Sequence, residues 1–396
     1  MPFTAALSTA PLTSAALTEV LARARAALTG KPDLALVFFS PHHAEAASTI
    51  VENVQRELQP RCLLGCVGES IIGNEREIEG APALSLWLGQ WSRPVEMESF
   101  HLRLERTSEG PSLLGWPDSL VGATAAQSAV LLLGDPFTFP IDPFLKQMNE
   151  DTPGVRVLGG MASGVRGPGE CVLLHDGEVR DQGAVGVVLQ GDVGLRSIVS
   201  QGCRPIGRHM VITKAEENII LELGGRTPLA QLQELWQELT PREQQLFQQG
   251  LHVGRVINEY RGDFQRGDFL VRNVLGLIRD SGALAIAERV RVGQTVQFHV
   301  RDADTADEDL HALLQLDLSA NDRTPGAALV FSCNGRGTRL FPQPNHDAGT
   351  VRAEAGEIPV AGFFAMGEFG PVGGQNFVHG FTASVVLFEE PKFSTD

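Results

Sequence analysis

Apolar runs that break at glycine or proline alternate along the chain with stretches in which apolar residues recur every three or four positions. The run LALVFFS at 34–40 ends before Pro41, and a helical pattern at 44–58 follows it. Next come CLLGC, an apolar run with an internal glycine, and two further apolar runs. Short apolar runs bounded by turn residues are typical of buried strands, whereas the longer spacing is typical of amphipathic helices. The segment therefore predicts a strand, a helix, a glycine-containing strand and one or two more strands.

The same order returns later in the chain. A second copy begins at Ala129 and contains VRVLGGMASG, a looser third copy begins at Asn218, and a fourth contains AALVFSCNGRG, a helical stretch near 346–356 and IPVAGFFAMGEFG. Recurrence of one supersecondary order predicts an α/β (α+β) fold of two lobes, built from four related β-α-β-β units with mixed, largely antiparallel sheets.

The predicted domains follow from these copies. The run GCRPIGRHMVITK at 202–214 is the expected boundary between the lobes, which gives an N-terminal domain at 31–205 and a C-terminal domain at 206–390. Apolar residues at helical spacing before Gly30 predict a packing helix within 1–30. Residues 391–396 are expected to form a short tail.

Composition narrows the classes of function. The 396 residues are 43% hydrophobic and carry a formal net charge of −16, which opposes binding to nucleic acid or to an anionic membrane. No apolar run reaches the ~20 residues that span a bilayer, and no signal-peptide pattern opens the chain, so we expect no membrane insertion and a cytoplasmic protein. The five cysteines form no disulfide framework and no metal-binding pair, so we expect reduced thiols and no metal. The sequence has no G-x-G-x-x-G after a strand and no P-loop with its lysine, so we expect no cofactor.

Candidate chemistry gathers where two C-terminal strand patterns end. The run at 329–337, LVFSCNGRG, brings Cys333, Asn334, Gly335 and Arg336 to its end, and the run at 358–371 brings Gly367 and Glu368 to its own. Glycine lets a ligand approach the backbone, and a guanidinium binds a carboxylate or phosphate through two hydrogen bonds. We therefore predict that Arg336 and Glu368 open onto one solvent-reachable hollow. The alternative is an internal ion pair between these two side chains.

These same residues resemble a known family. The motifs FSCNGRG and PVAGFFAMGEFGP with the closing strand HGFTASVVLF, together with LLGCVGES and VRVLGGMASG, are similar to the FIST family, named for F-box and intracellular signal transduction proteins. The resemblance implies a sensory module for a small ligand such as an amino acid, or a substrate receptor where an F-box precedes the domain. Because the segment before Leu34 is too short for an F-box, we do not expect the role of a substrate receptor for a ubiquitin ligase. With an amino acid as ligand, Arg336 would bind the carboxylate and Glu368 the ammonium group.

Other candidates have both a functional and a structural interpretation. Cys333 could act as a nucleophile with His379 as its base, although a buried thiol at a strand end explains it as well. The glycine and polar residues of the first copy, Gly65, Cys66 and Glu69, could admit a ligand to the backbone, or the glycine could let two sheets cross closely. The acidic run at 301–310 lacks the turn glycine of a calcium loop and is interpreted as a solvated loop.

The preferred hypothesis is a stand-alone FIST-like sensory protein that binds a small polar metabolite. Because the sequence carries no kinase, cyclase or methyl-accepting signature, its output would pass through a separate signalling protein. Two alternatives stay open. One is a hydrolase or transferase that uses Cys333, and the other is a protein-interaction scaffold whose pocket is vestigial.

Overall fold

A computed structural model describes residues 2–28, 30–92, 95–108 and 110–389. The chain divides into two compact units. The larger unit contains residues up to 199, residues 310–378 and residues from 382 onward, and the barrel unit contains residues 200–309 with 379–381. Among the described residues, no helix has the length and apolar content needed to cross a membrane.

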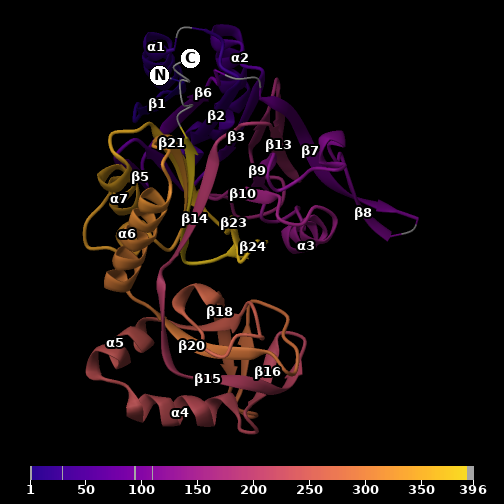
Figure 1. Ribbon diagram of the computed structural model, residues 1–396, viewed down its shortest axis with the longest axis vertical. Helices are drawn as coiled ribbons and strands as arrows, with labels where there is room; N and C mark the ends of the chain where they lie inside the picture. The colour runs from indigo at the N-terminus through magenta and orange to yellow at the C-terminus, as the bar shows by residue number, and fades with distance from the viewer. Residues whose placement is uncertain (1, 29, 93–94, 109, 390–396) are drawn as a thin grey trace. The chain divides into compact units, whose positions relative to one another are not determined.

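The larger unit is built on three sheets of mixed direction, which confirms the predicted fold class (Figure 1). The first has the order β1 (Phe3–Ser8), β6 (Leu84–Gly89), β2 (Leu34–Phe39), β3 (Cys62–Val67), β11 (Leu173–His175) and β12 (Glu178–Arg180). The second has the order β24 (Gln375–His379), β23 (Glu368–Val372), β10 (Arg156–Met161), β9 (Ser128–Gly134), β13 (Ala184–Gln190), β7 (Glu96–Thr107) and β8 (Gly110–Leu114). The third has the order β14 (Leu195–Gln201), β25 (Thr382–Glu389), β21 (Pro325–Cys333), β22 (Val360–Ala365), β4 (Ser70–Gly73) and β5 (Arg76–Glu79).

Each of these sheets contains one copy of the recurring unit. A parallel strand pair, joined by a helix, is flanked on its first strand by an antiparallel return strand. The three copies are β2/β3 with α2 (Ala47–Leu58) and β6, β9/β10 with α3 (Ile141–Asp151) and β13, and β21/β22 with α7 (His346–Ala355) and β25. The first, second and fourth predicted copies therefore adopt the same local topology.

The glycine inside the second strand of each pair has one structural cause. A Cβ at Gly65 would lie 2.3 Å from the carbonyl oxygen of Val37, and one at Gly159 would lie 1.9 Å from that of Leu132. A Cβ at Gly362 would likewise lie 1.8 Å from the carbonyl oxygen of Val330. No side chain fits at such separations, so the close approach of the paired strands requires glycine there. Of the two interpretations of Gly65, this geometry supports the structural one.

The expectation of a related unit beginning at Asn218 is wrong. The barrel unit is a closed barrel of the order β15 (Cys203–Glu216), β16 (Ile219–Leu223), β19 (Ala283–Ile286), β18 (Phe269–Ile278), β17 (Leu251–Val256) and β20 (Thr295–Arg301), in which every pairing is antiparallel. The helices α4 (Pro228–Glu238) and α5 (Pro241–Gln249) lead into β17, which pairs with β18 and β20 and not with β16. A strand–helix–strand order in the sequence does not determine whether the two strands pair with each other. In a barrel the second strand can pair with other strands instead, as β17 does with β18 and β20.

Two further segments differ from the sequence prediction. Within residues 1–30 the helix α1 (Thr13–Ala27) is present, but Phe3–Ser8 forms β1 at the edge of the first sheet. The acidic run at 301–310 is not a loop, because α6 spans Ala303–Ala320. Its Ala306, Leu310 and Leu314 are fully buried at four-residue spacing, so an apolar stripe hidden among the acidic residues makes this segment helical.

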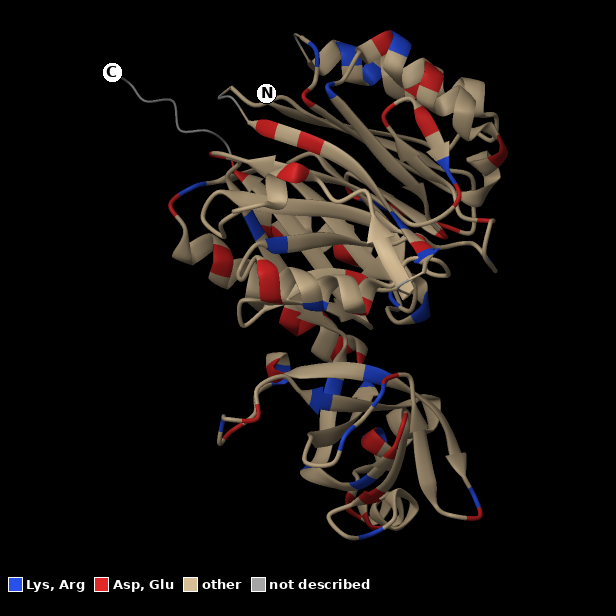
Figure 2. Cartoon of the chain, turned by 90° about the vertical axis from the view of Figure 1, so that its right-hand side faces the viewer, with Lys and Arg blue, Asp and Glu red and all other residues tan. Residues whose placement is uncertain are grey.

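Aromatic side chains fill the core between the first and third sheets. Phe38 packs against Phe331 and Phe363, with ring centroids 6.3 and 5.3 Å apart, and Trp87 packs against Phe388 at 4.9 Å. Lys, Arg, Asp and Glu lie mainly on helices, loops and strand ends, and the central strands carry few of them (Figure 2). Charged side chains in the interior of the larger unit are therefore exceptional, and each needs its own explanation.

Candidate functional site

Arg336 is sealed inside the larger unit, with 1% of its surface exposed. Its Nε and Nη2 donate to Oδ2 and Oδ1 of Asp347, both at 2.7 Å, and Asp347 is completely buried at the start of α7. The prediction that Arg336 faces a solvent-reachable hollow is therefore wrong. So is the alternative of an ion pair with Glu368, because the carboxylate that Arg336 binds belongs to Asp347.

Asp347 is held in its charged form by the groups around it. Burial alone would raise the pKa of this carboxyl group, but the charge of Arg336 and hydrogen bonds from His346 and Arg336 keep the pKa well below its usual range. Ser332 also donates its hydroxyl to Oδ2 at 2.7 Å. The pair therefore locks the end of β21 to α7, which is the role of a structural salt bridge.

Two glutamates near this pair are protonated much more readily. Burial and the charge of Asp347 raise the pKa of Glu77 to about 7, and burial raises the pKa of Glu368 to about 8. Glu368 is fully buried and accepts a hydrogen bond from Thr382 Oγ1 at 2.6 Å. A buried carboxyl group with such a pKa is largely neutral at pH 7, so Glu368 is not an anion that faces a ligand.

The remaining predicted site residues differ in how far they are exposed to solvent. Gly65, Cys66 and Gly367 are buried, whereas Glu69, Cys333, Asn334 and Gly335 are partly exposed. Arg339 forms an ion pair with Glu69 and donates Nη1 to the carbonyl oxygen of Asn334 at 2.8 Å. His379 is buried in the barrel unit, whereas Cys333 belongs to the larger unit. The thiol of Cys333 contributes a hydrogen bond to the carboxyl group of Glu368.

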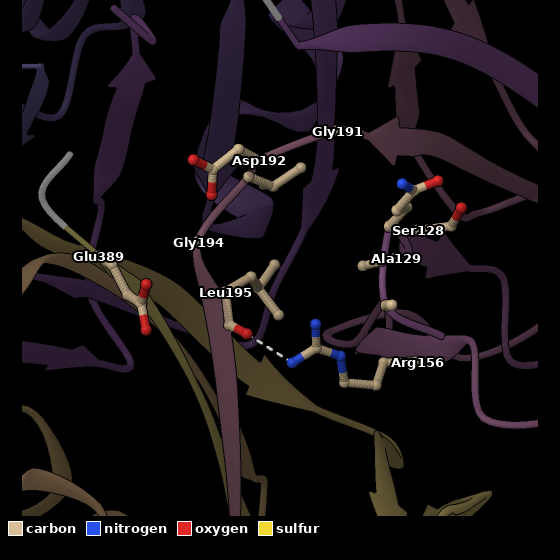
Figure 3. A pocket seen from close by; sticks show the side chains of 11 residues that line it. Ser128, Ala129, Arg156, Gly191, Asp192, Gly194, Leu195 and Glu389 are labelled. Atoms are coloured by element: carbon tan, nitrogen blue, oxygen red, sulfur yellow. Dashed lines mark hydrogen bonds between the residues drawn. The ribbon is translucent and has the colours of Figure 1, made fainter. Parts of the chain in front are cut away.

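A cavity of about 450 Å³ lies in another part of the larger unit. It opens where β9 and β10 begin, beside the turn before β14 and the end of β25 (Figure 3). Its lining residues are Ala126, Gln127, Ser128, Ala129, Arg156, Gly191, Asp192, Val193, Gly194, Leu195 and Glu389. This volume lies within the range of about 300–1,000 Å³ that is usual for small-molecule sites.

Arg156 places a positive charge in the lining of this cavity. Figure 3 shows the guanidinium directed into the space, with one nitrogen donating to the carbonyl oxygen of Leu195. Within the described part of the chain, none of the ion pairs joins Arg156 to a carboxylate. Burial lowers its pKa, and the charge of Glu389 opposes that effect. A partly buried guanidinium with unused donors is suited to bind an anion, whereas the donors Nε and Nη2 of Arg336 are already occupied by Asp347.

The opposite wall of the cavity is held in place before any ligand arrives. Glu389 accepts hydrogen bonds from Arg196 at 3.0 Å and from Arg323 at 2.8 Å, and its backbone N–H donates to the carbonyl oxygen of Gly194 at 2.7 Å. Gly194 has a φ of +57°, and a Cβ there would lie 3.1 Å from the Glu389 side chain. The turn before β14 therefore needs glycine in order to pack against Glu389.

Sequence reasoning missed this site because four separate segments form it. One signal was present. Arg156 is the only charged residue in the apolar run VRVLGGM, and a cation at the first position of a buried strand requires a partner or an opening.

Two family models match the chain in succession, the FIST N domain over residues 33–226 and the FIST C domain over residues 229–371. The chain belongs to the FIST family. FIST domains are associated with sensory functions in signal transduction. The FIST N match includes Arg156 and the cavity residues up to Leu195, whereas Glu389 lies beyond the FIST C match.

Similar proteins extend over nearly the whole FIST chain. An uncharacterised protein of Mycobacterium tuberculosis is 43% identical over 383 residues, which is 96% of this chain and 98% of the relative. An uncharacterised protein of Mycobacterium bovis is 41% identical over 384 residues, which is 96% of this chain and 97% of the relative.

Proposed function

We propose that this FIST protein is a sensory module that binds a small carboxylate-bearing metabolite in the cavity at Arg156. The observation that carries the proposal is a guanidinium that faces a cavity of about 450 Å³ and has no carboxylate partner among the described residues. A ligand carboxylate would supply a directly bound counter-charge through charge-assisted hydrogen bonds.

The rest of the lining favours a ligand that also carries a positive group. Asp192 lies on the turn that faces Arg156 across the cavity, and its carboxylate is 3.5 Å from Nη1 of Arg323. An ammonium group of the ligand would be attracted to this acidic wall. An amino acid, the ligand class that the FIST resemblance implies, combines both charges in a molecule small enough for the cavity.

The ligand is placed at Arg156 instead of Arg336 for a physical reason. A ligand carboxylate could bind Arg336 through two hydrogen bonds only after displacing Asp347, which would leave a buried carboxylate without its counter-charge. Arg156 requires no such exchange, because among the described residues its hydrogen bond goes to a backbone carbonyl and not to a carboxylate. We further propose that a separate signalling protein detects whether the cavity is occupied.

The test begins with a thermal-shift screen of amino acids and other small carboxylates, because a ligand that binds only the folded state raises the melting temperature. Hits are then measured by calorimetry on the wild type, on Arg156→Met and on the exposed control Lys146→Met. Loss of a hydrogen bond to a charged group is worth about 1.5–3 kcal/mol, so Arg156→Met should weaken binding by roughly 10- to 150-fold.

Lys146→Met should bind as the wild type does, since Lys146 points to solvent on α3. Recovery of the ligand unchanged after incubation supports a sensor, and conversion to a product supports the alternative of an enzyme. A carboxylate that binds Arg156→Met and the wild type with equal affinity would contradict the proposed site.

A further inference from the structure

The barrel unit contains a cavity of its own, with a volume of about 230 Å³. It lies between α4 and the strands β15 and β20 (Figure 1). None of the described residues lines both this cavity and the one at Arg156. The two cavities can therefore be tested independently.

A bulge in β15 accounts for this space. Ile206 pairs with Phe298 of β20, and the next pair joins Met210 to Val296, so β15 advances by four residues where β20 advances by two. Such bulges bend a strand away from its partner and are frequent beside functional sites. Gly207, inside the bulge, has a φ of +62°, and a Cβ there would lie 2.5 Å from the Leu235 side chain on α4. The bulged strand therefore needs glycine in order to pass α4 at this distance.

The inner part of the lining is apolar. Phe298 is 2% exposed and Leu235 is 7% exposed, and Met210 packs against the same core cluster while it lines the cavity. An apolar group placed against these side chains would be removed from water, which favours binding.

Two charged side chains in the lining lack a partner. Arg208 on β15 and Glu238 on α4 are exposed, and among the described residues neither side chain forms an ion pair or a hydrogen bond. Glu234, one turn earlier on α4, already forms an ion pair with Arg226. The cavity therefore presents one available cation and one available anion beside an apolar floor.

We propose that this cavity binds a small zwitterion with an apolar body. Its anionic group would contact Arg208 and its cationic group Glu238, while the body packs against the apolar floor. A ligand with a single charge would meet a charge of its own sign in the lining, which weakens its binding. Because the volume lies below the usual range of about 300–1,000 Å³, only a small body such as a branched alkyl group fits. The site goes beyond the proposed function, since it requires neither Arg156 nor its cavity.

Ligand-observed NMR with four probes tests the proposal on the full chain carrying Arg156→Met, in which the other cavity is weakened. L-Leucine has both charges and an isobutyl body, isocaproate lacks the ammonium group, isoamylamine lacks the carboxylate, and glycine lacks the body. An exposed charge contact is worth about a factor of 2–5, so L-leucine should bind more tightly than isocaproate and isoamylamine by that factor. Glycine should bind roughly 10-fold or more weakly than L-leucine, because it buries no apolar group.

Substitutions distinguish the two charge contacts. Arg208→Met should abolish the preference for L-leucine over isoamylamine and keep the preference over isocaproate, and Glu238→Gln should do the reverse. The matched controls are Lys214→Met and Glu216→Gln, which replace exposed charges on β15 outside the lining and should keep both preferences. Absence of L-leucine binding, equal affinities of L-leucine and the singly charged probes, or equal effects of a variant on every probe would each overturn the proposal. Comparison of Arg156→Met with the wild type separately tests the proposed function.

Discussion

Removal of the buried cation at Arg336 is the perturbation whose effect follows most directly from the structure. Arg336→Met keeps much of the side-chain length but removes both 2.7 Å contacts to Asp347. The carboxylate is then left fully buried, with hydrogen bonds from Ser332 and His346 but without its cation, beside the acidic Glu77. Breaking a buried pair from one side costs about 3–5 kcal/mol. For a unit of this size that loss corresponds to a fall in melting temperature of roughly 6–20 °C.

Urea unfolding followed by tryptophan fluorescence measures this loss, because Trp87, Trp91 and Trp116 all belong to the larger unit. The two units require separate transitions in the fit, since one two-state curve does not describe a chain of two compact units. Arg339→Met is the control. It removes a surface ion pair with Glu69, and Arg339 is 56% exposed, so it should change the free energy of unfolding by no more than about 1 kcal/mol.

The double variant Arg336→Met/Asp347→Leu distinguishes two contributions to the loss of stability. One is the lost attraction between Arg336 and Asp347, and the other is the cost of leaving the Asp347 carboxylate buried without a counter-charge. It should be more stable than Arg336→Met alone, because no uncompensated carboxylate remains in the interior. If Arg336→Met proves no more destabilising than Arg339→Met, the interpretation of Arg336 as a structural lock fails. Loss of ligand affinity without loss of stability in Arg336→Met would move the binding site from Arg156 back to the strand ends.

Two other predictions concern Glu368 and Gly159. In the folded protein Glu368 has a pKa of about 8, whereas in the unfolded chain it has the usual value of 4.5. The folded state therefore binds more protons than the unfolded state between these pH values, and the free energy of unfolding should fall as the pH rises. For this group the fall is at most about 1.4 kcal/mol per pH unit. Urea titrations at several pH values should show a shallower fall for Glu368→Gln, and identical slopes would refute the assignment. Gly159→Ala should destabilise the larger unit by several kcal/mol or prevent its folding, since Gly159 has a φ of +136° and its Cβ would lie 1.9 Å from the Leu132 carbonyl oxygen. Gly167→Ala, where a Cβ meets no atom within 4 Å, should change stability little, and equal effects of the two alanines on the urea midpoint would count against the close-approach explanation.

The sequence allowed the recurring strand–helix–strand order to be predicted where strands are fully buried and periodicity is strong, as at 34–67 and 129–161. The barrel could not be predicted, because strands that pair in parallel and strands that pair antiparallel can have the same apolar runs in the sequence. Arg336 between two glycines suggested an exposed cation, yet its partner Asp347 lies on a helix that folds back over it. Side-chain burial of this kind depends on tertiary contacts that local sequence does not encode. The cavity at Arg156 was hidden for the same reason.

The third sheet of the larger unit joins residues from both ends of the chain, since Gly73 on β4 pairs with Ala361 on β22. During synthesis β4 must wait for β22 to leave the ribosome, a delay of roughly 15–60 s at about 5–20 residues per second. The contiguous segment 200–309 of the barrel unit is synthesised within this interval and is complete roughly 3–10 s before Ala361 is added at the same rate. Throughout this interval Ile71 and Ile72, fully buried in the finished protein, have no partner strand from the C-terminal part and present apolar surface to the cell. A fragment that ends after the barrel would keep this surface permanently, so we expect such truncated chains to depend on chaperones and to aggregate.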